Sequence, residues 1–190
     1  MDAMPSYDDA LALFHTWTDD ERLRRHGYAV EAAMAHYADE FDADEALWRM
    51  TGLLHDMDYE KHPTEDEHPY VGVEVLAEHG YPEEMRTAIL GHAPYTGVER
   101  TTQLAKTLFA VDELAGFITA VAYVRPTKLE GMKVKSVTKK LKDSSFASGV
   151  DREHIQQGAE ELGMPLKEHI AHVIAGMQAD ASRLGLTADD

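Results

Sequence analysis

The chain has 190 residues, of which 44% are hydrophobic and 28% charged, and these proportions are typical of a globular protein with a substantial core. Its formal net charge is −17, which disfavours binding to nucleic-acid polymers and to anionic membrane surfaces. The chain contains no cysteine, so any metal ion must be held by nitrogen and oxygen ligands.

Neither targeting nor membrane-spanning signals are visible. Residues 1–9 lack the basic stretch and the following apolar run of a signal peptide. No apolar stretch reaches the length of a membrane span. We therefore expect a cytoplasmic protein with no membrane partner, folded as a single domain over residues 1–190. The acidic surface and a long apolar segment are compatible with a homodimer.

In the first half of the chain, helical signals follow one another. Ser6 and Asp9 have the spacing that caps a first helix. The acidic residues 19–21 are placed to open the second helix, and Asp42 and Asp44 to open the third. Residues 60–69, with two prolines and alternating charges, predict a loop before the next helix.

The second half of the chain continues the helical pattern. Pro82 fits the first position of a helix that follows Gly80. Residues 100–124 are apolar on most sides of a helix, which predicts a buried central helix. Two further helices are expected after Asp151 and Pro165. Because no alternating strand pattern extends beyond a few residues, the predicted fold class is all-α.

Histidine is frequent, with 11 in the chain, and it is the side chain that most often binds metals. The pair His55-Asp56 follows the apolar Leu53-Leu54. Burying such a pair in a helix is costly unless a charge or a hydrogen bond receives it. A metal cation is the recipient that we expect.

Four more residues of metal-binding type lie on separate helices or helix ends: His26, His68, His92 and Asp112. Each alone has an ordinary interpretation, such as a capping residue or a solvent-facing side chain. Together with His55 and Asp56 they supply four imidazoles and two carboxylates, which suit Fe, Mn, Ni or Zn and also permit Mg. Six ligands exceed one tetrahedral site, so we expect one or two divalent ions, with Asp56 as the bridge between two.

Other polar residues are candidates for substrate contacts. Seven of the 18 basic residues lie between positions 125 and 142. This segment indicates either a solvated helix face or a wall that binds the phosphate of a substrate. The predicted substrate-binding residues are Arg125, Lys128, Lys133 and Lys135.

Asp58 and Lys61 follow the His-Asp pair and are candidates for a proton donor and a phosphate contact, with a charged loop as the alternative. Tyr95, just after His92, is a candidate to line the pocket. The remaining histidines fit no ligand order, and we interpret them as surface or structural residues: His15, His36, His62, His79, His154, His169 and His172.

The order of His26, His55-Asp56 and Asp112 resembles the HD-domain metal-dependent phosphohydrolases. The similarity covers residues 20–117, which leaves 118–190 as a C-terminal helical extension of an HD-like bundle. The segment from Arg25 to Val30 also resembles the family. The resemblance implies a first metal held by the four residues His26, His55, Asp56 and Asp112. His68 and His92 resemble the additional ligands of the dinuclear branch and imply a second metal, held with Asp56.

This resemblance implies hydrolysis of a small phosphate ester, such as a nucleotide or a related metabolite, by metal-activated water. Asp56, Asp58 and Lys61 are the predicted catalytic residues. Ala93-Pro94 after His92 departs from the pattern of the cyclic-dinucleotide phosphodiesterases. The C-terminal part resembles a bacterial subgroup of predicted HD hydrolases.

Two other functions remain open at this point. The same ligands resemble those of di-iron HD-type oxygenases, which cleave a C–C or C–P bond. A noncatalytic binding module is the third alternative.

Overall fold

The protein is described here by a computed structural model that covers residues 4–189, so residues 1–3 and 190 of the expected single domain lie outside the described part. Within residues 4–189 the secondary structure is helical and contains no strand, which confirms the predicted all-α fold class. The helices are α1 (Tyr7–Trp17), α2 (Glu21–Glu40), α3 (Glu45–Leu54), α4 (Tyr70–Glu78), α5 (Glu83–His92), the short 3₁₀ helix η1 (Pro94–Thr96), α6 (Gln103–Tyr123), α7 (Val134–Leu141), α8 (Arg152–Leu162) and α9 (Leu166–Ala179).

Local sequence signals account for where these helices begin. Ser6 and Asp9 form the expected capping box, in which each side chain bonds to the backbone of the other residue. The Asp20 and Asp44 side chains cap α2 and α3 by accepting hydrogen bonds from backbone N–H groups. Pro82 lies at the N-cap of α5, one position before the predicted one.

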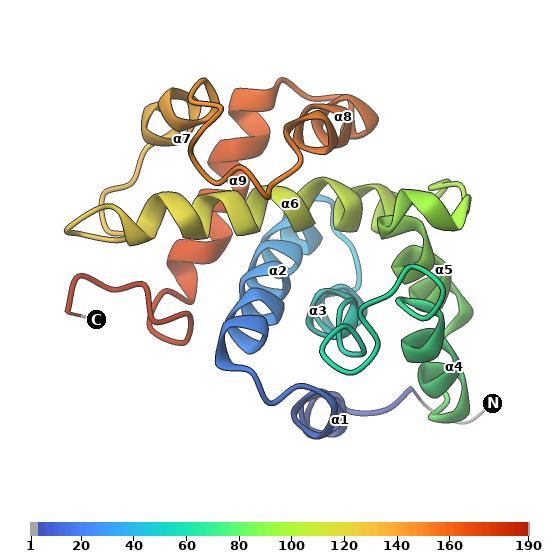
Figure 1. The fold of residues 1–190 in the computed structure, drawn as a ribbon. Helices are drawn as coiled ribbons and strands as arrows, with labels where there is room; N and C mark the ends of the chain where they lie inside the picture. Colours follow the sequence, from blue (N-terminus) through green and yellow to red (C-terminus); the bar gives the residue numbers. More distant parts are fainter. Residues whose placement is uncertain (1–3, 190) are drawn as a thin grey trace.

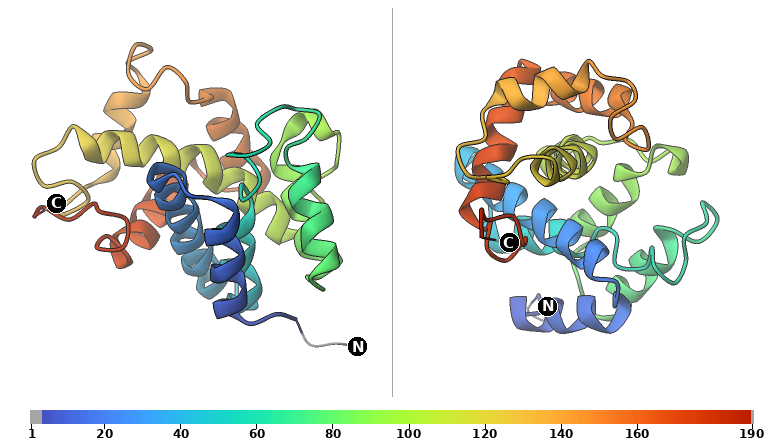
Figure 2. Two further views of the ribbon diagram at one scale, coloured as in Figure 1. Left: turned by 60° about the horizontal axis from the view of Figure 1, so that its bottom comes forward. Right: turned by 60° about the vertical axis from the view of Figure 1, so that its left-hand side comes forward.

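Helix α6 runs across the molecule, with α1 to α5 on one side and α7 and α8 on the other (Figure 1). It packs against α2 and α5 on the first side and against α8 on the second. Its apolar residues are buried along almost its whole length, which confirms the prediction of a central helix. The right-hand view in Figure 2 shows α7 and α8 on the side of α6 that faces away from α1.

Helix α2 is held closely by two neighbours. A Cβ atom at Gly52 of α3 would lie 2.9 Å from the backbone of Glu31, and one at Gly176 of α9 would lie 2.8 Å from Ala33 Cα. Only glycine permits such close helix approach. These contacts fix α2 relative to α3 and α9, and they thereby position the side chains that α2 presents.

No helix among the described residues is long and apolar enough to cross a membrane.

Candidate metal centre

The His55-Asp56 pair lies directly after α3, rather than within a buried helix as expected. His55 is the C-cap residue and is 1% exposed, whereas the Asp56 side chain is 24% exposed. The His55 Nδ1–H donates to the Gly52 carbonyl at 2.7 Å, which orients the ring and leaves Nε2 unprotonated in the neutral form. Nε2 is buried and has no hydrogen-bond partner among residues 4–189. The pair therefore presents one unpartnered nitrogen and one accessible carboxylate.

Two distant helices complete a first group around this nitrogen. His26 of α2 and Asp112 of α6 approach each other, with His26 Nε2 at 2.9 Å from Asp112 Oδ1. His55 Nε2 lies 3.3 Å from both Asp112 Oδ1 and Asp56 Oδ2, and His26 Nε2 lies 3.7 Å from Asp56 Oδ2. The ligand atoms of these four residues all lie within 4.8 Å of one another.

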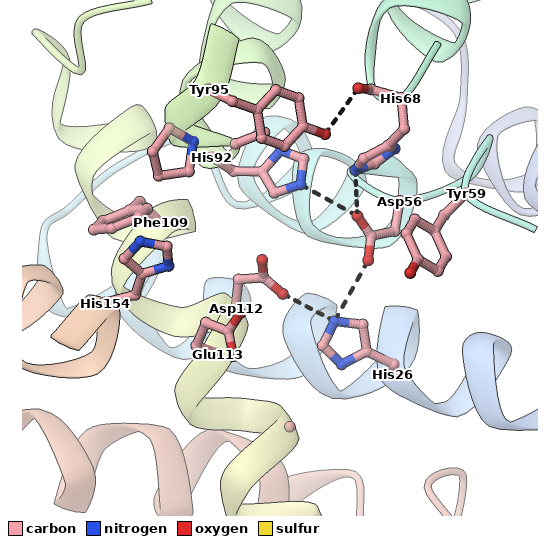
Figure 3. Close-up of a pocket in the computed structure, with 13 residues that line it drawn as sticks. His26, Asp56, Tyr59, His68, His92, Tyr95, Phe109, Asp112, Glu113 and His154 are labelled. Atoms are coloured by element: carbon pink, nitrogen blue, oxygen red, sulfur yellow. Dashed lines mark hydrogen bonds and ion pairs between the residues drawn. The ribbon is translucent and has the colours of Figure 1, made fainter. Parts of the chain in front are cut away.

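The other oxygen of Asp56 faces a second group. Asp56 Oδ1 lies 3.3 Å from His68 Nε2 and 3.2 Å from His92 Nε2. These three residues also place their ligand atoms within 4.8 Å of one another. Figure 3 shows Asp56 between His26 on one side and His68 and His92 on the other. All six predicted metal ligands thus converge, and Asp56 is common to both groups.

The imidazole rings of His68 and His92 are oriented by hydrogen bonds at Nδ1, the nitrogen that faces away from Asp56. His68 Nδ1 lies 2.7 Å from Asp58 Oδ1, and the other oxygen of Asp58 accepts the Gly72 N–H at 2.7 Å. His92 Nδ1 pairs with the Ile89 carbonyl. Such partners fix the tautomer and the orientation of a ligating imidazole. They leave the Nε2 atoms of both histidines directed at Asp56.

The histidines and carboxylates of the centre shift one another's pKa values. Burial lowers the pKa of His55, but the carboxylates of Asp56 and Asp112 more than reverse this effect, so the pKa lies well above its usual value. Burial likewise raises the pKa of Asp56, but His55 and His92 outweigh it and hold the pKa well below its usual value. The carboxylates therefore attract positive charge to this point. A divalent cation fits the unpartnered Nε2 atom, the convergent carboxylates and the mixed N/O ligand set.

A cavity of about 370 Å³ opens onto the centre. The residues that line it beside the ligands are Tyr59, Ala93, Pro94, Tyr95, Phe109, Glu113, Gly116 and His154. Tyr95 is the one that the sequence analysis singled out. Burial, followed by the charge of Asp112, raises the pKa of Glu113 to about 7.

His154, interpreted from the sequence as a surface or structural residue, comes to this cavity from α8. Its ring centroid lies 5.4 Å from that of Phe109 (Figure 3). Because the position of His154 depends on the packing of α8 against α6, no pattern within the sequence could have indicated it.

The structure places the predicted catalytic residues Asp58 and Lys61 outside the lining of the cavity. Asp58 is 1% exposed and lies behind His68. The Lys61 ammonium donates to the Thr16 carbonyl at 2.9 Å and lies over the Trp17 ring.

The predicted substrate-binding residues Arg125, Lys128, Lys133 and Lys135 also do not line the cavity. They follow the end of α6 at Tyr123, roughly 10 Å along the helix beyond Gly116. The Arg125 guanidinium is engaged locally, with the Lys128 carbonyl and the Ser136 hydroxyl. The structure therefore does not bring these four residues to the metal centre.

The HD domain family model matches residues 23–116, about half of the chain and the part that contains all six ligands. The chain belongs to the HD-domain superfamily. HD domains are generally metal-dependent hydrolases that bind divalent ions and act on small molecules. No curated protein and no solved structure gives a significant match to the chain.

Proposed function

We propose that this HD-domain protein is a phosphohydrolase that cleaves a small phosphate ester, such as a nucleotide or a related metabolite, with two divalent ions. The observation that carries the proposal is the position of Asp56. Its Oδ2 faces His26 and His55, whereas its Oδ1 faces His68 and His92. A carboxylate with one oxygen toward each of two ligand groups is arranged to bridge two ions.

Two divalent ions at this centre would lower the pKa of a bound water and neutralise charge on a phosphoryl group. The chain holds three of the ligands in place through the Nδ1 atoms of their imidazole rings. His55 bonds to Gly52, His68 to Asp58 and His92 to Ile89. Iron and manganese are the ions that we expect first.

The walls of the cavity favour a substrate with a small number of charges and a planar group. Among the described residues that line it there is no lysine and no arginine, while Glu113 adds a carboxylate. A phosphate must therefore be bound mainly through the ions, because the carboxylates alone would repel it. The rings of Tyr59, Tyr95 and Phe109 offer surfaces on which a base or another planar group can pack.

Activity assays test this proposal directly. The full-length chain, supplied with Mn²⁺ or Fe²⁺, should release phosphate or nucleotide from at least one member of a panel of phosphate monoesters and diesters. His55→Ala and Asp56→Ala should each lower turnover about a hundredfold or more, since even loss of an outer partner costs 10- to 100-fold. Elemental analysis of the purified protein should find two equivalents of iron or manganese.

The matched control is His79→Ala, because His79 is exposed and its side chain hydrogen-bonds, within the described part of the chain, to the Val75 carbonyl of the preceding helix. It should retain wild-type turnover. Unchanged turnover in Asp56→Ala would contradict the proposal. Oxygen consumption with an organic substrate and no phosphate release would indicate the di-iron oxygenase instead.

A further inference from the structure

A second group of metal-binding side chains lies where α2 and α9 pack together. It contains His36 and Glu40 of α2 and His172 of α9. It is separate from the six ligands described above, which are called the HD centre from here on: His26, His55, Asp56, His68, His92 and Asp112. The sequence predicts His36 and His172 to be surface or structural residues, because they fit no ligand order. The packing of α9 on α2 brings these two histidines together with Glu40.

The geometry of this group is that of a partly formed coordination site. His36 Nε2 lies 3.0 Å from His172 Nδ1 and 3.9 Å from Glu40 Oε1. All three ligand atoms lie within 4.8 Å of one another. Zn–N bonds of about 2.0 to 2.1 Å in tetrahedral geometry place neighbouring ligand atoms about 3.3 Å apart. The two distances from His36 Nε2 differ from this value by about 0.3 and 0.6 Å.

The backbone beneath the group is rigid. His36 and Glu40 are separated by one helical turn and therefore share a face of α2. At the crossing, a Cβ atom on Gly176 of α9 would lie 2.8 Å from Ala33 Cα and 3.1 Å from His36 Cβ, so the two helices are in direct contact. Ligands on two closely packed helices lose little freedom when an ion binds.

We propose that His36, Glu40 and His172 form a second, independent site for a transition-metal ion, for which Zn²⁺ is the chemically favoured occupant. Two imidazoles and one carboxylate suit Zn²⁺ and disfavour Mg²⁺ and Ca²⁺, which prefer oxygen ligands. The Glu40 side chain is 44% exposed, so water can take the fourth position. An ion here would join His36 and Glu40, within the family-matched residues 23–116, to His172 of α9, which lies outside them.

Zinc titration of the full-length chain, with competition by a chelator, tests the proposal. Wild-type protein should bind one more equivalent of Zn²⁺ than His172→Gln, whereas His79→Gln, a matched change at an exposed histidine, should bind as many as wild type. Excess Mg²⁺ should not displace this equivalent. Glu40→Gln, at an exposed position, should weaken the binding by at least about tenfold without risk to folding.

To separate this site from the HD centre, the same comparison is made in a chain that carries His55→Ala and Asp56→Ala. Adding His172→Gln should again remove one equivalent, whatever the HD centre retains and whether or not the protein is a phosphohydrolase. Equal zinc stoichiometry and affinity with and without His172→Gln and Glu40→Gln would overturn the proposal. His36 and His172 would then form a hydrogen bond with each other and bind no metal ion.

Discussion

At the scale of single residues, the geometry of the HD centre depends on which ring nitrogen of each histidine makes a hydrogen bond to the surrounding protein. His55, His68 and His92 each use Nδ1 for a partner behind the ring and direct Nε2 at a carboxylate. Two of these partners are backbone carbonyls, but the partner of His68 is the buried side chain of Asp58. The sequence predicts a catalytic role for Asp58, whereas its position behind His68 supports a positioning role.

This role predicts the effect of Asp58→Asn. An asparagine can accept from His68 or from Gly72 through its single carbonyl oxygen, but not from both. We expect the affinity for one of two ions at the HD centre to fall about 10- to 100-fold. Chelator competition measures this change.

Asp66→Asn, in an exposed turn, is the matched control and should bind metal as wild type does. If the two variants bind both ions equally well, Asp58 does not position His68. A loss of turnover with unchanged metal affinity would instead support the proton-donor role predicted from the sequence.

At the scale of helices, the packing of α8 on α6 decides the shape of the cavity, because it brings His154 to the wall. The contact is close at Gly158, where a Cβ atom would lie 2.5 Å from Ala110 Cα and 2.9 Å from Ala110 Cβ. A larger side chain at Gly158 would therefore overlap with α6.

Gly158→Ala should therefore destabilise the protein. Alanine favours a helix by about 1 kcal/mol over glycine, but the overlap with the α6 backbone exceeds this gain, so we expect a net loss of about 1 to 3 kcal/mol. Denaturant unfolding measures the change. Gly149→Ala, where a Cβ atom meets nothing within 4 Å, is the control and should not lower the stability. A Gly158→Ala variant as stable as wild type would show that α8 can shift freely on α6.

At the scale of the whole molecule, His169 connects three helices. It is fully buried, its Nδ1 pairs with the Tyr37 hydroxyl of α2 at 2.5 Å, and its Nε2–H donates to the Ala110 carbonyl of α6 at 2.7 Å. Burial lowers the pKa of His169 to about 4. The folded protein therefore keeps this histidine neutral under conditions that protonate it in the unfolded chain.

A pH dependence of stability follows. Between the unfolded value of about 6.5 and the folded value of about 4, the unfolded chain binds more protons at this position, so the stability falls as the pH decreases. Above pH 6.5, His169 does not lower the stability. As the pH falls to 4, the free energy of unfolding decreases by about 3 kcal/mol because of this histidine. The free energy of unfolding of His169→Gln should accordingly fall less steeply over this range than that of wild type. Equal slopes for the two proteins would contradict the assignment, and exposed His79→Gln serves as the control.

The helices and the metal ligands could be predicted from the sequence because both depend on local chemistry. Capping residues and apolar spacing act within one or two turns, and these signals identified where α1, α2 and α3 begin. Likewise, His55-Asp56 is recognisable wherever the fold places it, because an adjacent imidazole and carboxylate have few uses in an apolar environment. The match to the HD domain family confirms the family that this pair and its companions indicated.

Only the tertiary structure decided the geometry of the metal centre and which further side chains join a site. The direction of each Asp56 oxygen, the arrival of His154 at the cavity and the meeting of His36 with His172 all depend on how separate helices pack. The basic residues after position 124 illustrate the same point, because their composition suggested phosphate binding but the length of α6 carries them away from the cavity. Residue type and spacing determine which chemistry is available, whereas helix packing determines the distances at which that chemistry can operate.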